Sequence, residues 1–295
     1  LVAEIRLTDI NRGITHNSFH IIDKTNGNNE QNILLVNDDF SPLFQKFAKP
    51  EARYKIKTRY DLDSIFIRIY PLETSLPPAP DQTLTAEPLL KPDTSFWFVL
   101  RDTSWFRFNQ RGMYFFSFHP NNQGGLSVFN FGLNYPRLKD AEELLEPLQY
   151  LTTKKEYKKY LELTNPKLAV DTFWMATTGN AGRAREAIRI FYNRVQLANY
   201  YFTSLTQGWK TDRGMIYIVY GAPMMLYKTD STERWVYDKN NQNIGMEFIF
   251  TNQKNIFTSN HFVLHRGEAF QKSWYQAVNA WRAGYTFDFY EQDTR

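Results

Sequence analysis

The hydrophobic pattern of the chain changes its period near Tyr135. Before that residue, apolar and polar side chains alternate along short runs such as Tyr54 to Tyr60 and Ile65 to Ile69, and turn-rich segments separate the runs. Alternation with a period of two is typical of half-buried β-strands. After Tyr135 apolar residues recur at helical spacing. The pattern therefore predicts two domains, an all-β unit over 1–136 and an α+β unit over 137–295.

The first unit is expected to hold about seven to nine short strands and no helix, which predicts an antiparallel β-sandwich of immunoglobulin-like type. The chain has no cysteine, so this prediction rests on the alternation alone. Besides the two runs above, the expected strands are Ala3 to Leu7, Phe19 to Asp23, Ile33 to Asn37, Phe96 to Arg101, Trp105 to Phe108, Met113 to His119 and Leu126 to Leu133.

A proline-rich segment over 71–92 interrupts the β unit. Proline has no N–H to donate to a strand ladder, so a long loop is expected there. The segment also carries several leucines, which predicts that it lies in an extended form against a partner surface or against another part of this chain. The candidate interaction residues are Pro77, Pro78, Pro80, Leu89 and Leu90.

Helix signals follow Tyr135. Thr153 and Glu156 have the spacing of a capping box, Pro166 suits the first turn of a helix, and Asn180 caps a longer helix whose apolar stripe is expected to be core. A small antiparallel sheet and a final helix complete the expected α+β unit. Its predicted strands are Met215 to Tyr220, Arg234 to Tyr237, Met246 to Phe250 and Phe262 to Leu264, and the final helix is Glu268 to Ala283.

The densest motif is the string Gly208-Trp209-Lys210-Thr211-Asp212-Arg213-Gly214, which separates the long helix from the predicted strand at Met215. A helix-to-strand junction explains it. Gly208 permits a left-handed exit from the helix, Trp209 fills the core, and Thr211 and Asp212 accept backbone N–H groups. Gly214 admits a close backbone approach. The alternative is that Asp212 is a catalytic carboxylate modulated by Arg213.

Composition and missing motifs narrow the function classes. The 35 basic and 31 acidic residues give a net charge of +4 without a basic stripe, which disfavours nucleic-acid binding. Without cysteine there is no thiolate metal site or cysteine nucleophile. The sequence holds no GxGxxG, GxxxxGK[ST], HExxH or GxSxG motif, and the pairs His16/His20 and His261/His265 lie in strand-like or loop sequence. No cofactor, metal or membrane span is predicted.

The string Gly208 to Gly214 resembles the signature of the GWxTD domain family, and the resemblance extends over about 144–285. Flanking matches include Phe173-Trp174, Tyr200-Tyr201-Phe202-Thr203, Gly221-Ala222-Pro223 and Trp235-Val236-Tyr237. Many family members have Gly-Pro-Pro where this chain has Gly221-Ala222-Pro223. The resemblance implies an exported cell-envelope protein of Bacteroidota-like bacteria, often with a β-sandwich ahead of the signature domain and a signal or lipoprotein leader. It implies no catalytic residues.

The preferred interpretation is a non-enzymatic envelope protein, periplasmic or associated with the outer membrane, that acts as a scaffold or accessory subunit of an outer-membrane assembly or transport complex. Its partners would be other envelope proteins, and a lipid anchor could lie outside this chain. A glycan-binding or glycan-processing protein is the first alternative, because carboxylates, Tyr and Trp are plentiful. An unrecognised hydrolase is the second.

Overall fold

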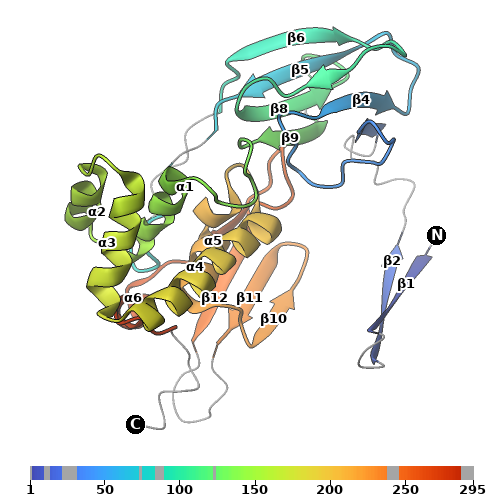
Figure 1. Cartoon of the computed structure of the whole chain (residues 1–295). Helices are drawn as coiled ribbons and strands as arrows, with labels where there is room; N and C mark the ends of the chain where they lie inside the picture. Colours follow the sequence, from blue (N-terminus) through green and yellow to red (C-terminus); the bar gives the residue numbers. More distant parts are fainter. Residues whose placement is uncertain are drawn as a thin grey trace.

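The computed structural model describes residues 2–9, 14–21, 32–72, 75–83, 90–121, 124–237 and 246–286, and for the first two ranges only the backbone. Strands β1 (Val2–Asp9) and β2 (Ile14–Ile21) pair with each other as an antiparallel two-stranded sheet. Figure 1 shows this hairpin apart from the other sheets. Within the described residues these first runs form a sheet of their own and pair with no strand of the other sheets, so their expected place in the β-sandwich is not confirmed.

Two further antiparallel sheets make up the β unit. One has the order β3-β4-β7 and the other β6-β5-β8-β9. Inward side chains of both sheets, such as Leu35 and Tyr54 on one and Ile67 and Phe116 on the other, belong to one core cluster. The strands are β3 (Ile33–Val36), β4 (Arg53–Thr58), β5 (Ser64–Tyr70), β6 (Thr94–Val99), β7 (Phe106–Arg107), β8 (Gly112–Ser117) and β9 (Leu126–Asn130).

The helices begin where the capping residues predict. Thr153 and Glu156 form the capping box of α2 (Lys154–Leu161), Pro166 is the first residue of α3 (Pro166–Thr178), and Asn180 caps α4 (Ala181–Phe202). These predictions are confirmed. The remaining helical elements are α1 (Ala141–Leu145), η2 (Glu146–Leu151), η3 (Gly208–Lys210), α5 (Asp212–Tyr220), η4 (Glu268–Phe270) and α6 (Gln271–Arg282).

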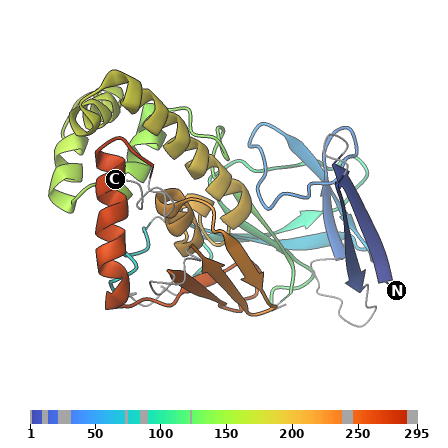
Figure 2. The same ribbon diagram turned by 90° about the horizontal axis from the view of Figure 1, so that it is seen from below.

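A four-stranded antiparallel sheet with the order β10-β11-β12-β13 supports the helices. Its strands are β10 (Met225–Lys228), β11 (Thr232–Val236), β12 (Glu247–Asn252) and β13 (Phe262–Leu264). One face carries Trp235, Phe248 and Leu264, which share a core cluster with Val195 of α4 and Trp281 of α6. Figures 1 and 2 show the helices gathered on one side of this sheet, so the α+β architecture predicted for this part of the chain is confirmed.

The run Met215 to Tyr220 is a correction, because it is helical rather than a strand: it lies in α5. Eight of the nine residues of α5 are buried, so the helix has no polar face. A helix buried on all sides gives a continuous apolar run, which periodicity alone cannot distinguish from a buried strand.

The β unit and the α+β unit meet through aromatic side chains. Phe257, from the connection between β12 and β13, is buried with its ring centre 5.0 Å from that of Tyr70 and 5.3 Å from that of Phe115. A second contact joins Phe47 of the β unit to Tyr200 of α4, with ring centres 6.3 Å apart. The outer face of the four-stranded sheet in the β unit is thus partly covered by the rest of the chain.

Candidate functional site

The two glycines of the signature allow three backbone segments to touch. A Cβ atom on Gly208 would lie 2.0 Å from the carbonyl oxygen of Ala198 in α4, and one on Gly214 would lie 2.0 Å from the carbonyl oxygen of Gly208. No side chain fits in either place. The signature therefore packs α5 on η3 and η3 on α4. The close backbone approach predicted for Gly214 is confirmed. The left-handed helix exit predicted for Gly208 is wrong, because Gly208 also serves a close backbone approach.

Thr211 begins helix α5. Its hydroxyl donates to the Gly208 carbonyl oxygen (2.7 Å) and accepts from the Gly214 N–H (3.0 Å). One side chain thereby satisfies an otherwise unpaired N–H of the first turn and fixes the preceding turn. The role expected of Thr211 as an acceptor of a backbone N–H is confirmed, although the element it starts is a helix.

Trp209 is buried, as expected, with 1% of its surface exposed. Its indole N–H donates to the Gln207 side chain (2.6 Å), its backbone N–H donates to the Asn199 side chain (3.1 Å), and its carbonyl oxygen accepts from the Tyr150 hydroxyl (2.8 Å). Burial raises the pKa of Tyr150 well above its ordinary value, so this hydroxyl remains a donor. The Lys210 ammonium lies 4.9 Å from the Trp209 ring centre.

Asp212 faces strand β13 rather than its own turn. Its carboxylate accepts the Leu264 N–H (2.7 Å) and forms an ion pair with Arg266, and both side chains are less than a tenth exposed. Burial raises the pKa of Asp212, while Arg266 and the Leu264 N–H oppose that change. The same burial lowers the pKa of Arg266, with Asp212 opposing it. A carboxylate held in this way stabilises the packing of α5 on the sheet.

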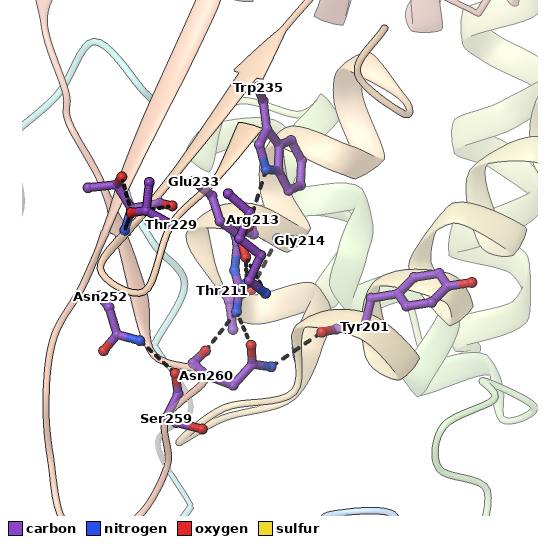
Figure 3. A network of polar contacts seen from close by, with 12 residues as sticks. Tyr201, Thr211, Arg213, Gly214, Thr229, Glu233, Trp235, Asn252, Ser259 and Asn260 are labelled. Atoms are coloured by element: carbon purple, nitrogen blue, oxygen red, sulfur yellow. Dashed lines mark hydrogen bonds and ion pairs between the residues drawn. The ribbon is translucent and has the colours of Figure 1, made fainter. Parts of the chain in front are cut away.

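Arg213 points in a different direction, into a polar network (Figure 3). It donates to Glu233 of β11 (3.0 Å), to the Asn260 carbonyl oxygen (2.7 Å) and to the Asn260 side-chain oxygen (2.6 Å). Its guanidinium lies over the Phe262 ring, 4.3 Å from the ring centre. Glu233 also accepts the Trp235 indole N–H (3.2 Å). Asp212 and Arg213 are thus engaged by separate partners, and neither modulates the other as the catalytic alternative requires.

The proline-rich segment lies on the signature domain where the structure describes it. Arg266, the partner of Asp212, donates to the carbonyl oxygens of Pro78 (2.8 Å) and Ala79 (3.2 Å), and the Gly267 N–H donates to that of Pro80 (3.0 Å). Pro77 is half-buried beside them. Of the two surfaces predicted for this segment, these residues contact another part of the same chain. Leu90 packs at the contact between the two units, and Leu89 lies outside the described residues.

Sequence reasoning missed the partners of the signature. Asn199 lies on the apolar stripe of α4, four residues after Val195. Glu233 lies two residues before Trp235, so both side chains point to the same, inward face of β11. A buried polar residue could have been predicted at both positions from the sequence pattern. Asn199 also donates to the Pro136 carbonyl oxygen (2.9 Å). Nothing in the sequence distinguishes Arg266 or Tyr135, whose hydroxyl contacts Thr203 and accepts the Gly208 N–H (3.3 Å).

A cavity of about 600 Å³ opens beside the signature. Tyr135, Gln207 and Trp209 line it together with cationic and anionic side chains, and one of these cations, Lys210, is paired with Glu146 at 3.1 Å. Its charged lining is mixed: Arg111, Arg137, Lys210, Asp93, Asp140, Glu142, Glu143 and Glu146. Among the described residues no cluster of three or more His, Asp or Glu side chains has the arrangement of a metal site.

Comparison with known protein families matches the GWxTD domain over residues 112–283, which is more than half of the chain. The chain belongs to the GWxTD domain family. The match begins in β8, so it includes two strands that the sequence pattern assigns to the β unit. Searches of curated proteins and of solved structures returned no significant match. No helix in the described part of the chain is long and apolar enough to span a membrane.

Proposed function

We propose that this chain is a non-enzymatic protein of the cell envelope that serves as a scaffold or accessory subunit of an outer-membrane-associated assembly or transport complex. The observation that carries the proposal is that both charged side chains of the signature are buried and already bound within the chain. The Asp212 carboxylate binds Arg266, and the Arg213 guanidinium binds Glu233 and Asn260. Groups held this way set the position of a helix. A general acid, base or nucleophile needs access to a substrate.

The envelope location, the kinship with proteins of Bacteroidota-like bacteria and a lipoprotein leader rest on the resemblance to the GWxTD family. The immunoglobulin-like nature of the β unit is part of the same proposal. If β3 to β9 are lettered A to G, the sheets are A-B-E and D-C-F-G. This arrangement differs from the constant-type immunoglobulin order only in the sheet that holds strand D.

A surface role is also supported by apolar side chains that the two cores leave exposed. Helices α2 and α3 pack against each other and present Leu161, Leu168 and Met175, each more than half exposed; Leu168 and Met175 lie two turns apart on one face of α3. Exposed apolar side chains that gather in this way mark protein contact surfaces. An envelope protein with a complementary apolar patch is the partner we expect there.

The test is recovery of partners by the tagged chain from gently solubilised native membranes, quantified by mass spectrometry. Leu168→Glu should reduce recovery of the specific partner without changing the melting temperature, whereas Lys167→Glu, which places the same charge one residue earlier on exposed surface, should not. Purification without any other envelope protein, together with turnover of a defined substrate that a single carboxylate or serine substitution abolishes, would replace this proposal by an enzymatic function.

A further inference from the structure

Three sheet edges in the described residues are covered by other segments of the chain. Beside β9, the Ala48 N–H donates to the Phe129 carbonyl oxygen (2.9 Å) and the Phe129 N–H donates to that of Lys46 (2.8 Å). Beside β3, the Leu43 N–H donates to the Leu35 carbonyl oxygen (2.8 Å). The Asp212 carboxylate accepts an N–H of β13. Covering an edge in this way prevents pairing with strands of other molecules.

Other edge strands, such as β7 and β10, also pair with a single neighbour, but each contains a charged residue, Arg107 and Lys228. Strand β6 ends the four-stranded sheet of the β unit and, within the described ranges, pairs with β5 alone (Figure 1). Its six residues, Thr-Ser-Phe-Trp-Phe-Val, contain no charged residue and no proline. Charged residues and prolines are the usual means by which edge strands avoid pairing with other chains, and this strand lacks both.

The register shows which backbone groups of β6 face outward. The Leu100 N–H donates to the Asp63 carbonyl oxygen (2.8 Å), and the pairing of Ile65 with Phe98 continues the same ladder. In an antiparallel pair, alternate residues bond to the neighbouring strand and those between them point away. The residues between them, Ser95, Trp97 and Val99, therefore direct their N–H and C=O groups to the open edge.

The side chains of the same residues are also exposed. Trp97 is 48% and Val99 49% exposed, whereas Phe96 and Phe98 are half-buried and pack against the core of the β unit. Backbone groups and apolar side chains are thus offered together at one edge. A third strand placed there would satisfy the backbone groups and cover part of both side chains.

We propose that the occupant is β6 of a second copy of this chain, paired antiparallel about a two-fold axis at Trp97. This register places Trp97 opposite Trp97, and Ser95 of each copy opposite Val99 of the other. All of these residues have outward-facing backbone groups, so each opposed pair exchanges two N–H···O bonds. The two four-stranded sheets join into one continuous sheet.

Charge complementarity favours a second copy over an unrelated strand. The exposed residues Asp93 and Arg101 precede and follow the uncharged strand. Each lies four residues from Trp97, so the two-fold register brings the side chain of Asp93 of each copy near that of Arg101 of the other. The Asp93 N–H donates to the Ile69 carbonyl oxygen (2.8 Å) and the Arg101 carbonyl oxygen accepts from the Ser104 N–H (2.9 Å), so the backbone pairing between copies ends before these two residues. The edge is self-complementary, as an isologous interface requires, and opposite charges at its two ends fix the register.

Sedimentation velocity of the 295-residue chain tests the proposal. A single strand pair covers less surface than the about 1,200–2,000 Å² of a stable interface, so we expect a dimer with a Kd on the order of 10–100 μM. Asp93→Arg and Arg101→Asp each place like charges at both ends of the interface and should weaken the dimer about 10-fold or more. Lys272→Asp, a reversal on the exposed surface of α6, should leave it unchanged.

The decisive measurement mixes the two charge-reversed variants. A heterodimer of Asp93→Arg with Arg101→Asp has opposite charges at both ends, so mixing should restore association that neither variant shows alone. In addition, Trp97→Pro removes an N–H that makes no bond within its own sheet and should abolish the dimer. The pairing would be refuted if the wild-type chain stayed monomeric at about 200 μM, well above the expected Kd. It would also be refuted if the single charge reversals left the dimer unchanged. If the proline variant fails to fold, the mixing experiment still tests the proposal.

Discussion

Replacing Gly214 by alanine sets two physical effects against each other. Gly214 is the third residue of α5, and inside a helix alanine is favoured over glycine by about 1 kcal/mol. Propensity alone therefore predicts that Gly214→Ala stabilises the protein. The structure predicts the opposite, because the added Cβ would lie 2.0 Å from the Gly208 carbonyl oxygen and 2.9 Å from the Trp209 Cα.

The size of the effect follows from that geometry. Non-bonded atoms are in favourable contact at about 3.5–4.0 Å, so the methyl group falls short by about 1.5 Å against backbone atoms that have no rotamer to change. Relief requires α5 to move away from η3, which disturbs the packing around Trp209. Overpacking typically costs about 1–3 kcal/mol and occasionally more, and a contact this short against rigid backbone atoms belongs at the upper end of that range or above it. The net loss is then about 1–3 kcal/mol, or a melting temperature lower by about 3–10 °C.

Thermal and urea denaturation followed by circular dichroism measure the change. Gly267→Ala is the matched control, because a Cβ there meets no atom within 4 Å and the backbone is extended, with φ −179°. This control should unfold at the wild-type temperature or slightly above it. A Gly214→Ala protein as stable as the control would show that α5 and η3 are not in tight contact and would refute the account of the signature as a close crossing.

Three further results are expected. Trp209→Ala removes a buried ring and should cost about 3–5 kcal/mol of unfolding free energy in urea denaturation; an unchanged melting temperature with lost partner binding would contradict this. Asp212→Ala leaves Arg266 buried without its carboxylate and should cost about 3–5 kcal/mol, whereas an unchanged denaturation midpoint would show the pair to be dispensable. Hydrogen bonds from Arg282 and Thr153 lower the pKa of Glu156 to about 2 from 4.5, so its contribution, present above about pH 4.5, is lost as the pH falls toward 2. Glu156→Gln should flatten the acid limb of a stability-versus-pH curve over that window, and an identical curve would refute the linkage.

Local signals predicted the helices of the second half well, because their information lies within a few residues. The capping box of Thr153 and Glu156, the proline at 166 and the Asn180 cap each satisfy backbone groups of the turn they begin. The same local reasoning failed at α5. Thr211 is a residue type that commonly caps helices, but the residues after it are buried on all sides, so their apolar side chains show no helical periodicity.

The partners of the signature depend on tertiary structure, which a single sequence does not reveal. Arg266 is 54 residues from Asp212 along the chain, and the two meet only because β13 lies beside α5. The proline-rich segment shows the same limit. Its composition predicted an extended segment against some surface, but its contact with Arg266 follows from how the β unit folds back on the signature domain.

The two charges at the start of α5 explain why the signature combines a close glycine crossing with buried ions. Glycine contacts fix how near α5 lies to η3 and α4, but they leave the helix free to rotate about its axis. Adjacent residues of a helix point about 100° apart, and here Asp212 binds the backbone and Arg266 at β13 while Arg213 binds Glu233 of β11 and Asn260. Two ion pairs in different directions allow one rotation only. Replacing a whole buried pair by well-packed apolar residues changes net stability little, so we infer that the role of these pairs is to specify this single arrangement. Replacing both members of each pair, Asp212 with Arg266 and Arg213 with Glu233, by well-packed apolar residues should keep the melting temperature and weaken the near-ultraviolet dichroism of Trp209.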